Sequence, residues 1–246
     1  MRVNNRSLTV RSKAMNKVFA FAFLIAMVFL SQVLPKAVDK PKQTITQNFV
    51  ELCQQQNSLS ATVTKTIDAL LEIAGTTDCQ LSDSKLRSLS KLEIVGNEIS
   101  DVKPLALLSN LNELNLSNNE ISDVKPLTKL SNLTIVNLNY NKISDIKPLV
   151  VLCKLTILDL NYNKISDVKS LASLNKLTEL ALSSNKISDV KPLGFLINLT
   201  SLDLSYNRIS DVKPLASLSK LTELYLHWNQ SSLKNCPVKP ESICKF

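Results

Sequence analysis

The sequence has little glycine, few aromatic residues and almost no histidine. It holds 3 glycines and 1 histidine in 246 residues, and aromatic residues make up 5% of the chain. It has no G-x-S-x-G motif, no H-E-x-x-H motif and no glycine-rich phosphate loop. A histidine-based catalytic triad would have His227 as its only base, with no accompanying motif. We therefore expect no enzymatic activity, no cofactor and no metal site.

The positive charge of the chain lies mostly at its start. The formal net charge is +8, and six basic residues with no acidic residue fall within residues 1–37, which leaves +2 for the rest. A nearly neutral body lacks the broad positive field that attracts phosphate groups. Nucleic acid is therefore not an expected partner.

Residues 1–37 have the three parts of a secretory signal. A basic stretch ends at Lys17, and an apolar run of 13 residues covers 18–30. Ala37 is the candidate residue just before the cleavage site, although Pro35 then occupies a position where signal peptides prefer a small residue. The run is shorter than the about 20 residues of a bilayer span. We expect a signal peptide, with an uncleaved anchor, and hence membrane association, as the alternative. The mature chain would be secreted, periplasmic or held at the cell surface.

Seven asparagines recur at a spacing of 22 residues, and apolar residues recur at fixed offsets around them. The shared pattern is L-x-x-L-x-L-x-x-N-x-I-S-D-V-K-P-L-x-x-L, and it covers residues 89–229. Seven units in register indicate a repeat protein. The asparagines, which we expect to form a structural ladder, are Asn97, Asn119, Asn141, Asn163, Asn185, Asn207 and Asn229.

Each unit predicts a strand, a turn and a return segment. Leu114 and Leu116 alternate with period two, which predicts a short strand with both side chains inward. Asn119 follows at the bend, where its amide can satisfy backbone groups that have no partner in the sheet. Residues 124–130 have an apolar spacing of three, which suits a 3-10 or extended segment begun by Pro126. Stacked units would bury one continuous core beneath a parallel sheet.

These units resemble the leucine-rich repeat family in its 22-residue class, and the I-S-D-V-K-P-L half is similar to the internalin type of bacterial surface protein. The resemblance implies an α/β right-handed solenoid with a parallel concave sheet and a convex side of 3-10 or extended segments. It also implies a protein partner at the concave face, without identifying that partner.

The segments on either side of the repeats are expected to cover the open ends of the core. Residues 38–88 predict a helical N-terminal cap, with a short helix over 49–53 and a second helix from Ser60 to Gly75. Residues 230–246 form the expected C-terminal cap, because the repeat pattern lapses at Ser231.

Five cysteines in an exported chain suggest two disulfides and one free thiol. Seven stacked strands at about 4.8 Å would hold the two caps about 30 Å apart, whereas bridged cysteines need Cα atoms within about 7 Å. The expected pairs are therefore Cys53 with Cys79 and Cys236 with Cys244. Cys153 falls where the other units vary, so we expect a tolerated substitution; a redox or intermolecular role is the alternative.

Most units also carry an aspartate two residues before a lysine. We expect these aspartates to hydrogen-bond their own turns rather than to form a row of metal ligands. They are Asp101, Asp123, Asp145, Asp167, Asp189 and Asp211.

Aromatic residues on or just after the strands define two candidate binding patches. Tyr and Trp are favoured interface anchors, because they bury a large area at low entropic cost. Recent duplication of neighbouring units is the alternative explanation for the central patch, and packing of Trp228 over the last core layer is the alternative for the terminal cluster. The central patch comprises Ile135, Asn137, Asn139, Tyr140, Ile157, Asp159, Asn161 and Tyr162. The terminal cluster comprises Tyr206, Tyr225, His227 and Trp228.

The expected function is that of an exported, monomeric module that binds a protein, or alternatively a glycan, through its concave face without catalysis. An intracellular regulatory scaffold, resembling the phosphatase-binding leucine-rich repeat proteins, is the competing hypothesis. The leader and the cysteines of the caps argue against it.

Overall fold

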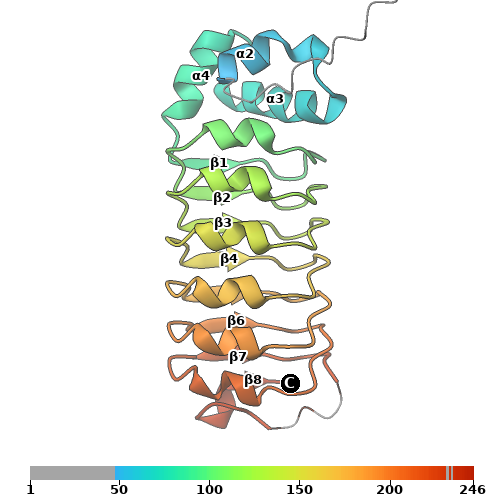
Figure 1. Ribbon diagram of the computed structural model, residues 1–246, viewed down its shortest axis with the longest axis vertical. Helices are drawn as coiled ribbons and strands as arrows, with labels where there is room; N and C mark the ends of the chain where they lie inside the picture. Colours follow the sequence, from blue (N-terminus) through green and yellow to red (C-terminus); the bar gives the residue numbers. More distant parts are fainter. Residues whose placement is uncertain (1–47, 231–232, 234) are drawn as a thin grey trace, which may run out of the picture. The chain divides into compact units, whose positions relative to one another are not determined.

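A parallel sheet of eight short strands runs along the described chain (Figure 1). Each strand pairs with the next in sequence, and from β1 to β7 residues 22 apart lie opposite each other, as Leu114, Val136 and Leu158 do. The constant repeat length therefore keeps equivalent residues in register across the sheet. The strands are β1 (Lys91–Glu93), β2 (Glu113–Asn115), β3 (Ile135–Asn137), β4 (Ile157–Asp159), β5 (Glu179–Ala181), β6 (Ser201–Asp203), β7 (Glu223–Tyr225) and β8 (Cys244–Lys245).

The structure is a computed structural model that describes residues 48–230, 233 and 235–246. The leader predicted for residues 1–37 and the first part of the predicted N-terminal cap, 38–47, lie outside the described residues. In the described part of the chain, no helix is long and apolar enough to span a bilayer.

A 3-10 helix connects each pair of successive strands from β1 to β7, on the other side of the core from the sheet (Figure 1). The apolar spacing of three turns Val124, Leu127 and Leu130 inward, and all three are fully buried. The sequence allowed a 3-10 or an extended segment here, and the structure has 3-10 helices. They are η2 (Lys103–Leu107), η3 (Lys125–Lys129), η4 (Lys147–Val151), η5 (Lys169–Ser173), η6 (Lys191–Phe195) and η7 (Lys213–Ser217).

The core is a stack of aliphatic layers between the strands and the 3-10 helices. We call each 22-residue unit a rung. In the rung of Asn119, the apolar residues of the strand and its exit and the isoleucine after the asparagine point inward; Leu114, Leu116 and Ile121 are at most 2% exposed. Each rung covers the apolar edge of its neighbours, so the core is continuous. The predicted solenoid is confirmed.

Helices cover the N-terminal end of this core. The predicted helix that follows Ser60 ends at Gly75, whose φ of 64° is the left-handed conformation typical of a helix stop. A third helix was missed by the sequence analysis; Asp78 caps it by accepting a hydrogen bond from the Leu81 N–H at 2.8 Å. The elements are α2 (Phe49–Gln54), η1 (Gln56–Ser58), α3 (Ala61–Ala74) and α4 (Cys79–Arg87).

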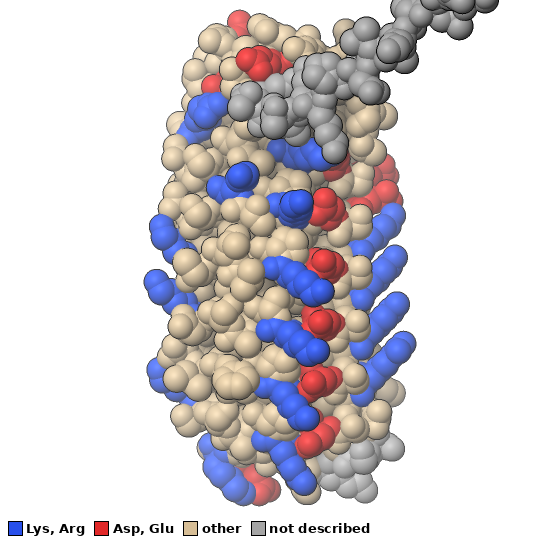
Figure 2. Space-filling view, viewed as in Figure 1, with Lys and Arg blue, Asp and Glu red and all other residues tan. Residues whose placement is uncertain are grey.

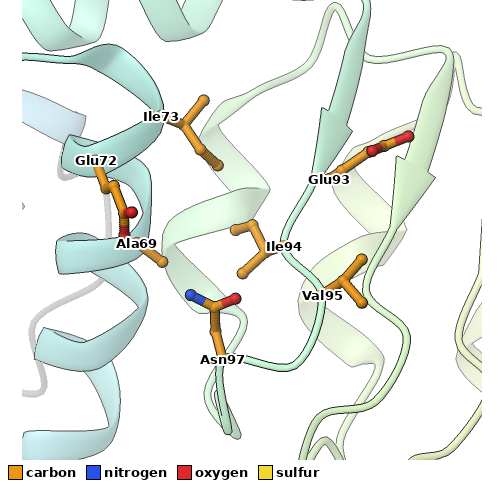
Figure 3. A pocket seen from close by; sticks show the side chains of 7 residues that line it. All are labelled: Ala69, Glu72, Ile73, Glu93, Ile94, Val95 and Asn97. Atoms are coloured by element: carbon orange, nitrogen blue, oxygen red, sulfur yellow. The ribbon is translucent and has the colours of Figure 1, made fainter.

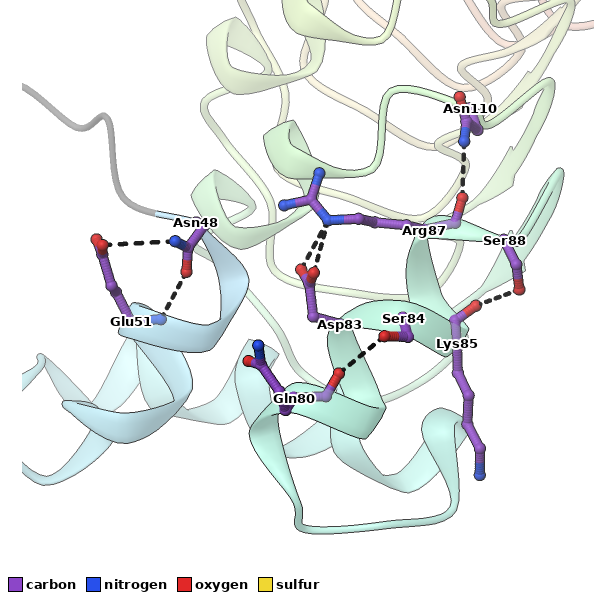
Figure 4. A network of polar contacts seen from close by, with 9 residues as sticks. All are labelled: Asn48, Glu51, Gln80, Asp83, Ser84, Lys85, Arg87, Ser88 and Asn110. Carbon is purple, nitrogen blue, oxygen red and sulfur yellow. Dashed lines mark hydrogen bonds and ion pairs between the residues drawn. The ribbon is translucent and has the colours of Figure 1, made fainter.

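A disulfide and a network of polar contacts hold the N-terminal cap together (Figure 4). Cys53 of α2 is bonded to Cys79 of α4, with their Cα atoms 5.7 Å apart. Arg87 forms an ion pair with Asp83 one helical turn earlier. Asn110, which follows η2, donates a hydrogen bond of 2.7 Å to the carbonyl of Arg87, so the cap is tied directly to the repeats.

An eighth strand, also missed by the sequence analysis, ends the sheet. β8 pairs with β7 through Cys244, which lies opposite Leu224. A disulfide between Cys236 and Cys244 holds this strand, and Val238 is buried beside the core, flanked by η8 (Glu241–Ile243). Both disulfides are the pairs that the sequence predicts. β8 has two residues and no apolar alternation, so no periodic pattern marks it.

Candidate binding surface

The asparagine after each strand fixes the turn that carries the candidate binding residues. In the rung of Asn141, the side-chain Oδ1 accepts a hydrogen bond from the Ile121 N–H at 2.9 Å, and Nδ2 donates to the carbonyls of Leu116, Leu138 and Asn139 at 3.0–3.1 Å. The amide thereby satisfies backbone groups of two rungs. The same arrangement recurs at Asn119, Asn163, Asn185, Asn207 and Asn229.

Asn97 has the spacing of this ladder but a different environment. Its side chain lines a hollow between α3 and the first rung, where Ile73 of α3 and Ile94 point toward each other (Figure 3). The hollow has a volume of about 450 Å³, and Glu72 and Glu93 stand at its wall. The sequence predicts a cap at this end, and no motif in it predicts a hollow there.

A column of threonines forms a second ladder that the sequence analysis missed. Each hydroxyl donates a hydrogen bond of 3.0–3.1 Å to a carbonyl of the preceding rung, as Thr156 does to Thr134. The column comprises Thr134, Thr156, Thr178, Thr200 and Thr222.

The residue before each ladder asparagine has a positive φ, and we call these residues the positive-φ column. Their φ values are 50–56° from the second rung on, a region that bulky side chains rarely adopt. From Gly96 to Tyr206, the N–H of each column residue donates to the next rung and helps to hold the backbone there, as Tyr140 does to the carbonyl of Asn161 at 3.0 Å. Four of these positions nevertheless carry Tyr or Trp, which points to a use for the ring. The column is Gly96, Asn118, Tyr140, Tyr162, Ser184, Tyr206 and Trp228.

In the central patch, the structure brings equivalent residues of two rungs together. The rings of Tyr140 and Tyr162 stack with centroids 4.0 Å apart and planes 10° apart. Ile135 lies opposite Ile157 across β3 and β4. The hydrogen bond between the two tyrosines raises the pKa of Tyr140. The patch therefore presents an aliphatic pair on the sheet and an aromatic pair at its margin.

The polar members of the central patch are engaged in the turn itself. Asn137 accepts a hydrogen bond from the Asn139 N–H at 3.0 Å, and Asp159 accepts one from the Asn161 N–H at 3.0 Å. The Asn139 amide also donates to Asp159 at 2.9 Å. These side chains stabilise the strand exit, as Asx turns do, so the groups left for a partner are chiefly the isoleucines and the rings.

The terminal cluster forms two aromatic contacts. Tyr206 stacks on Trp228 with centroids 5.7 Å apart, and Tyr225 lies 6.5 Å from the His227 ring. Trp228 is 74% exposed, so it does not cover the last core layer as the cap-packing alternative required. The carboxylate of Glu223 raises the pKa of Tyr225, because a nearby negative charge disfavours the phenolate.

Acidic residues outnumber basic residues on the strands. Carboxylates dominate the exposed strand positions, where Lys91 is the one cation of the described strands β1–β7. It pairs with Glu93 at 2.9 Å and lies 3.8 Å from Glu113, and these carboxylates raise its pKa. The other strand carboxylates are Glu179 and Glu223, which are exposed, and Asp159 and Asp203, which are half-buried.

The residue after each ladder asparagine is basic in four successive rungs, and we call these residues the basic column. All four are exposed, and they are Lys142, Lys164, Lys186 and Arg208. Figure 2, which looks at the 3-10 side, shows rows of basic side chains along the solenoid, one of them at the right-hand margin. The net charge alone does not reveal this local arrangement.

The aspartate column behaves as the sequence predicts. Each Oδ1 accepts a hydrogen bond of 2.8–3.0 Å from the N–H two residues later, as Asp123 does from Lys125. Among the described residues, the Lys side chain pairs with the aspartate only in the first case, Asp101 and Lys103. No group of three potential metal ligands is found in that part of the chain. Cys153 is an exposed free thiol.

Two family profiles match the repeats of this chain. The family described as "Leucine Rich repeats (2 copies)" matches residues 109–150 and 153–194, and the one described as "Leucine rich repeat" matches residues 175–230. No curated protein matches the chain in sequence.

Solved structures of two internalins from Listeria monocytogenes are similar to this chain. The internalin inlF is 30% identical, with a TM-score of 0.55 over 68% of this chain and 56% of its own. Internalin C2 is 29% identical, with a TM-score of 0.53 over 70% of this chain and 88% of its own. This chain thus spans little more than half of the length of inlF.

A plant peptide hormone receptor, RGFR1, solved in complex with RGF2, is 28% identical with a TM-score of 0.51. The match covers 60% of this chain and 26% of the receptor. The profile matches, the register of the rungs and the likeness to two internalins agree. The chain belongs to the leucine-rich repeat proteins, with repeats of the internalin type.

Proposed function

We propose that this chain is an exported module that binds a protein partner through the exposed face of its sheet, which the sequence predicts to be concave. The central patch is its anchor. The observation that carries the proposal is the stacked pair of Tyr140 and Tyr162, held at positive φ beside Ile135 and Ile157. Strained backbone and exposed rings coincide there, and clustered aromatics are the usual hot spots of interfaces.

The comparisons support the class of partner. Internalin structures share the repeat, and the receptor with a related fold is in complex with RGF2. Two disulfides support export over the intracellular scaffold, because structural disulfides rarely persist in the cytosol. We propose that residues 1–37 direct export and that the module comprises the cap of 38–88, the repeats of 89–229 and the cap of 230–246, acting as a monomer without catalysis.

Affinity capture with the full chain, followed by measurement of the purified partner, tests this function. Tyr140→Ala combined with Tyr162→Ala should weaken binding at least about tenfold, since hot-spot truncations cost about 2 kcal/mol or more. Asn118→Ala, in the same column outside the patch, should leave the affinity unchanged. Wild-type affinity of the double variant would refute the central patch. Cell fractionation and sequencing of the mature N-terminus test export.

A further inference from the structure

One small residue interrupts the aromatic part of the positive-φ column. Ser184 lies between Tyr162 and Tyr206, one rung from each. Neighbouring strands are about 4.8 Å apart, so these two tyrosines are about 10 Å apart along the solenoid. Tyr162 stacks on Tyr140 and Tyr206 stacks on Trp228, so one ring face of each is covered by its pair. The other face of each ring is turned toward the rung of Ser184.

The distance between Tyr162 and Tyr206 is large enough for one further aromatic ring to lie between them. Aromatic contacts in proteins have centroids about 4.5–7 Å apart, and a ring midway would lie about 4.8 Å from each neighbour. The chain itself places a tyrosine at this position in the rungs of Tyr140, Tyr162 and Tyr206. Ser184 therefore leaves an aromatic position that a ligand ring can complete.

Positive charge accompanies the same three rungs. Two residues after each of Tyr162, Ser184 and Tyr206, the basic column has Lys164, Lys186 and Arg208, all exposed. Lys142 in the preceding rung pairs with Glu120 at 2.9 Å. By contrast, no ion pair involves Lys164, Lys186 or Arg208 in the part of the chain that the structure describes.

Three cations at successive rungs repel one another unless a ligand supplies counter-charges. Among the carboxylates of these rungs, Glu179 lies on its strand, before the positive-φ column, whereas Asp167, Asp189 and Asp211 lie beyond the basic column and each accept a hydrogen bond from their own turn. Acidic groups beside a ligand ring would therefore be favoured on the side of the basic column and disfavoured on the side of the sheet.

We propose that the Ser184 position binds an aromatic side chain of a protein partner that is flanked by acidic residues. The inference rests on the proposed function, because it names the chemistry of the partner that the sheet would engage. Its site is one rung beyond the central patch, at the C-terminal side of Tyr162.

Synthetic peptides test the site on the full exported chain by calorimetry at low ionic strength. The probe has one tryptophan between two pairs of acidic residues. Matched peptides replace the tryptophan by alanine or the acidic residues by lysines. The probe should bind at least about tenfold more tightly than either matched peptide, and its affinity should fall as salt screens the charges. Equal binding of the probe and the alanine peptide would overturn the proposal.

Ser184→Tyr is the decisive variant, because it fills the position with the residue that adjacent rungs already tolerate. It should abolish probe binding, while Asn118→Tyr, in the same column away from the site, should leave it unchanged. Lys186→Glu should weaken probe binding at least about fivefold, and circular dichroism verifies that each variant is folded. Undiminished binding by Ser184→Tyr, or binding of heparin or single-stranded DNA that exceeds that of the probe, would overturn the assignment.

The purified partner separates this inference from the proposed function. If Ser184→Tyr leaves partner affinity unchanged while the Tyr140→Ala and Tyr162→Ala double variant loses it, the proposed function stands and the Ser184 assignment fails. If the peptide results hold but the double variant keeps full partner affinity, the Ser184 site stands and the central patch fails.

Discussion

The side-chain oxygen of Asn141 accepts a hydrogen bond of 2.9 Å from the backbone N–H of Ile121, twenty residues earlier. The same amide donates to three carbonyls, and Asn141 is buried. One side chain thus joins two rungs at the point where the strand ends.

Replacement of Asn141 by alanine should leave these backbone groups without partners. We expect Asn141→Ala to lower the free energy of unfolding by about 1–3 kcal/mol, measured by urea denaturation. Lys164→Ala removes an exposed side chain and should change stability by less than about 0.5 kcal/mol. Equal effects of the two substitutions would contradict the role given to the asparagine ladder.

Ser170 replaces the proline found at the second position of the other 3-10 helices between the strands, and its hydroxyl is buried without a hydrogen-bond partner within the described residues. Ser170→Pro should stabilise the folded chain by about 0.4–1 kcal/mol, because proline lowers the conformational entropy of the unfolded chain. Prolines at the equivalent positions of the other rungs already adopt the folded conformation required here. Ser170→Ala removes the hydroxyl alone and separates the two contributions. A lower melting temperature for the proline variant would show that this rung differs from the others.

The Cys53–Cys79 disulfide should stabilise the N-terminal cap. Native disulfides of small domains contribute about 2–5 kcal/mol, so a double change of Cys53 and Cys79 to serine should lower the melting temperature clearly. Cys153→Ser, at the exposed free thiol, should leave it unchanged. An unchanged melting temperature of the double variant would mean that the disulfide is dispensable.

Tyr225 should ionise above the usual pKa of about 10, because the Glu223 carboxylate disfavours its phenolate. Ultraviolet titration of the chain should therefore show one tyrosine whose late transition disappears in Tyr225→Phe. Glu223→Gln removes the negative charge and should shift that transition to lower pH. An unchanged transition would mean that the carboxylate does not act on this ring.

Periodic features of the fold could be predicted from the sequence, and singular features could not. The alternation of Leu114 and Leu116 predicts a strand, and the apolar residues at equivalent positions every 22 residues predict the register of the sheet. Gly75 marks the end of α3 because a left-handed helix stop favours glycine. By contrast, α4 begins at Cys79, after its N-cap Asp78, and buries only Ser82 and Leu86, while β8 pairs through two residues held by a disulfide.

The candidate site was predictable in its residue types and not in its backbone. The tyrosines stood out because they occupy variable positions, but their positive φ could not be inferred, since local preference would place Gly or Asn there. The rung-to-rung hydrogen bonds from the N–H groups of Tyr140, Tyr162 and Tyr206 favour that conformation. Likewise, the turn contacts of Asn137 and Asp159 depend on where the strand ends, which side-chain identity alone does not specify.

The threonine column has a consequence for how such proteins change length over generations. The Thr156 hydroxyl donates to the Thr134 carbonyl and the Thr178 hydroxyl donates to the Thr156 carbonyl, and the junctions from Thr134 to Thr222 all use this same link. A gene duplication or deletion of one whole 22-residue block would therefore create a junction chemically equivalent to those already present. The surface that contacts a partner can therefore grow or shrink by one rung at a time, without any new kind of contact in the core.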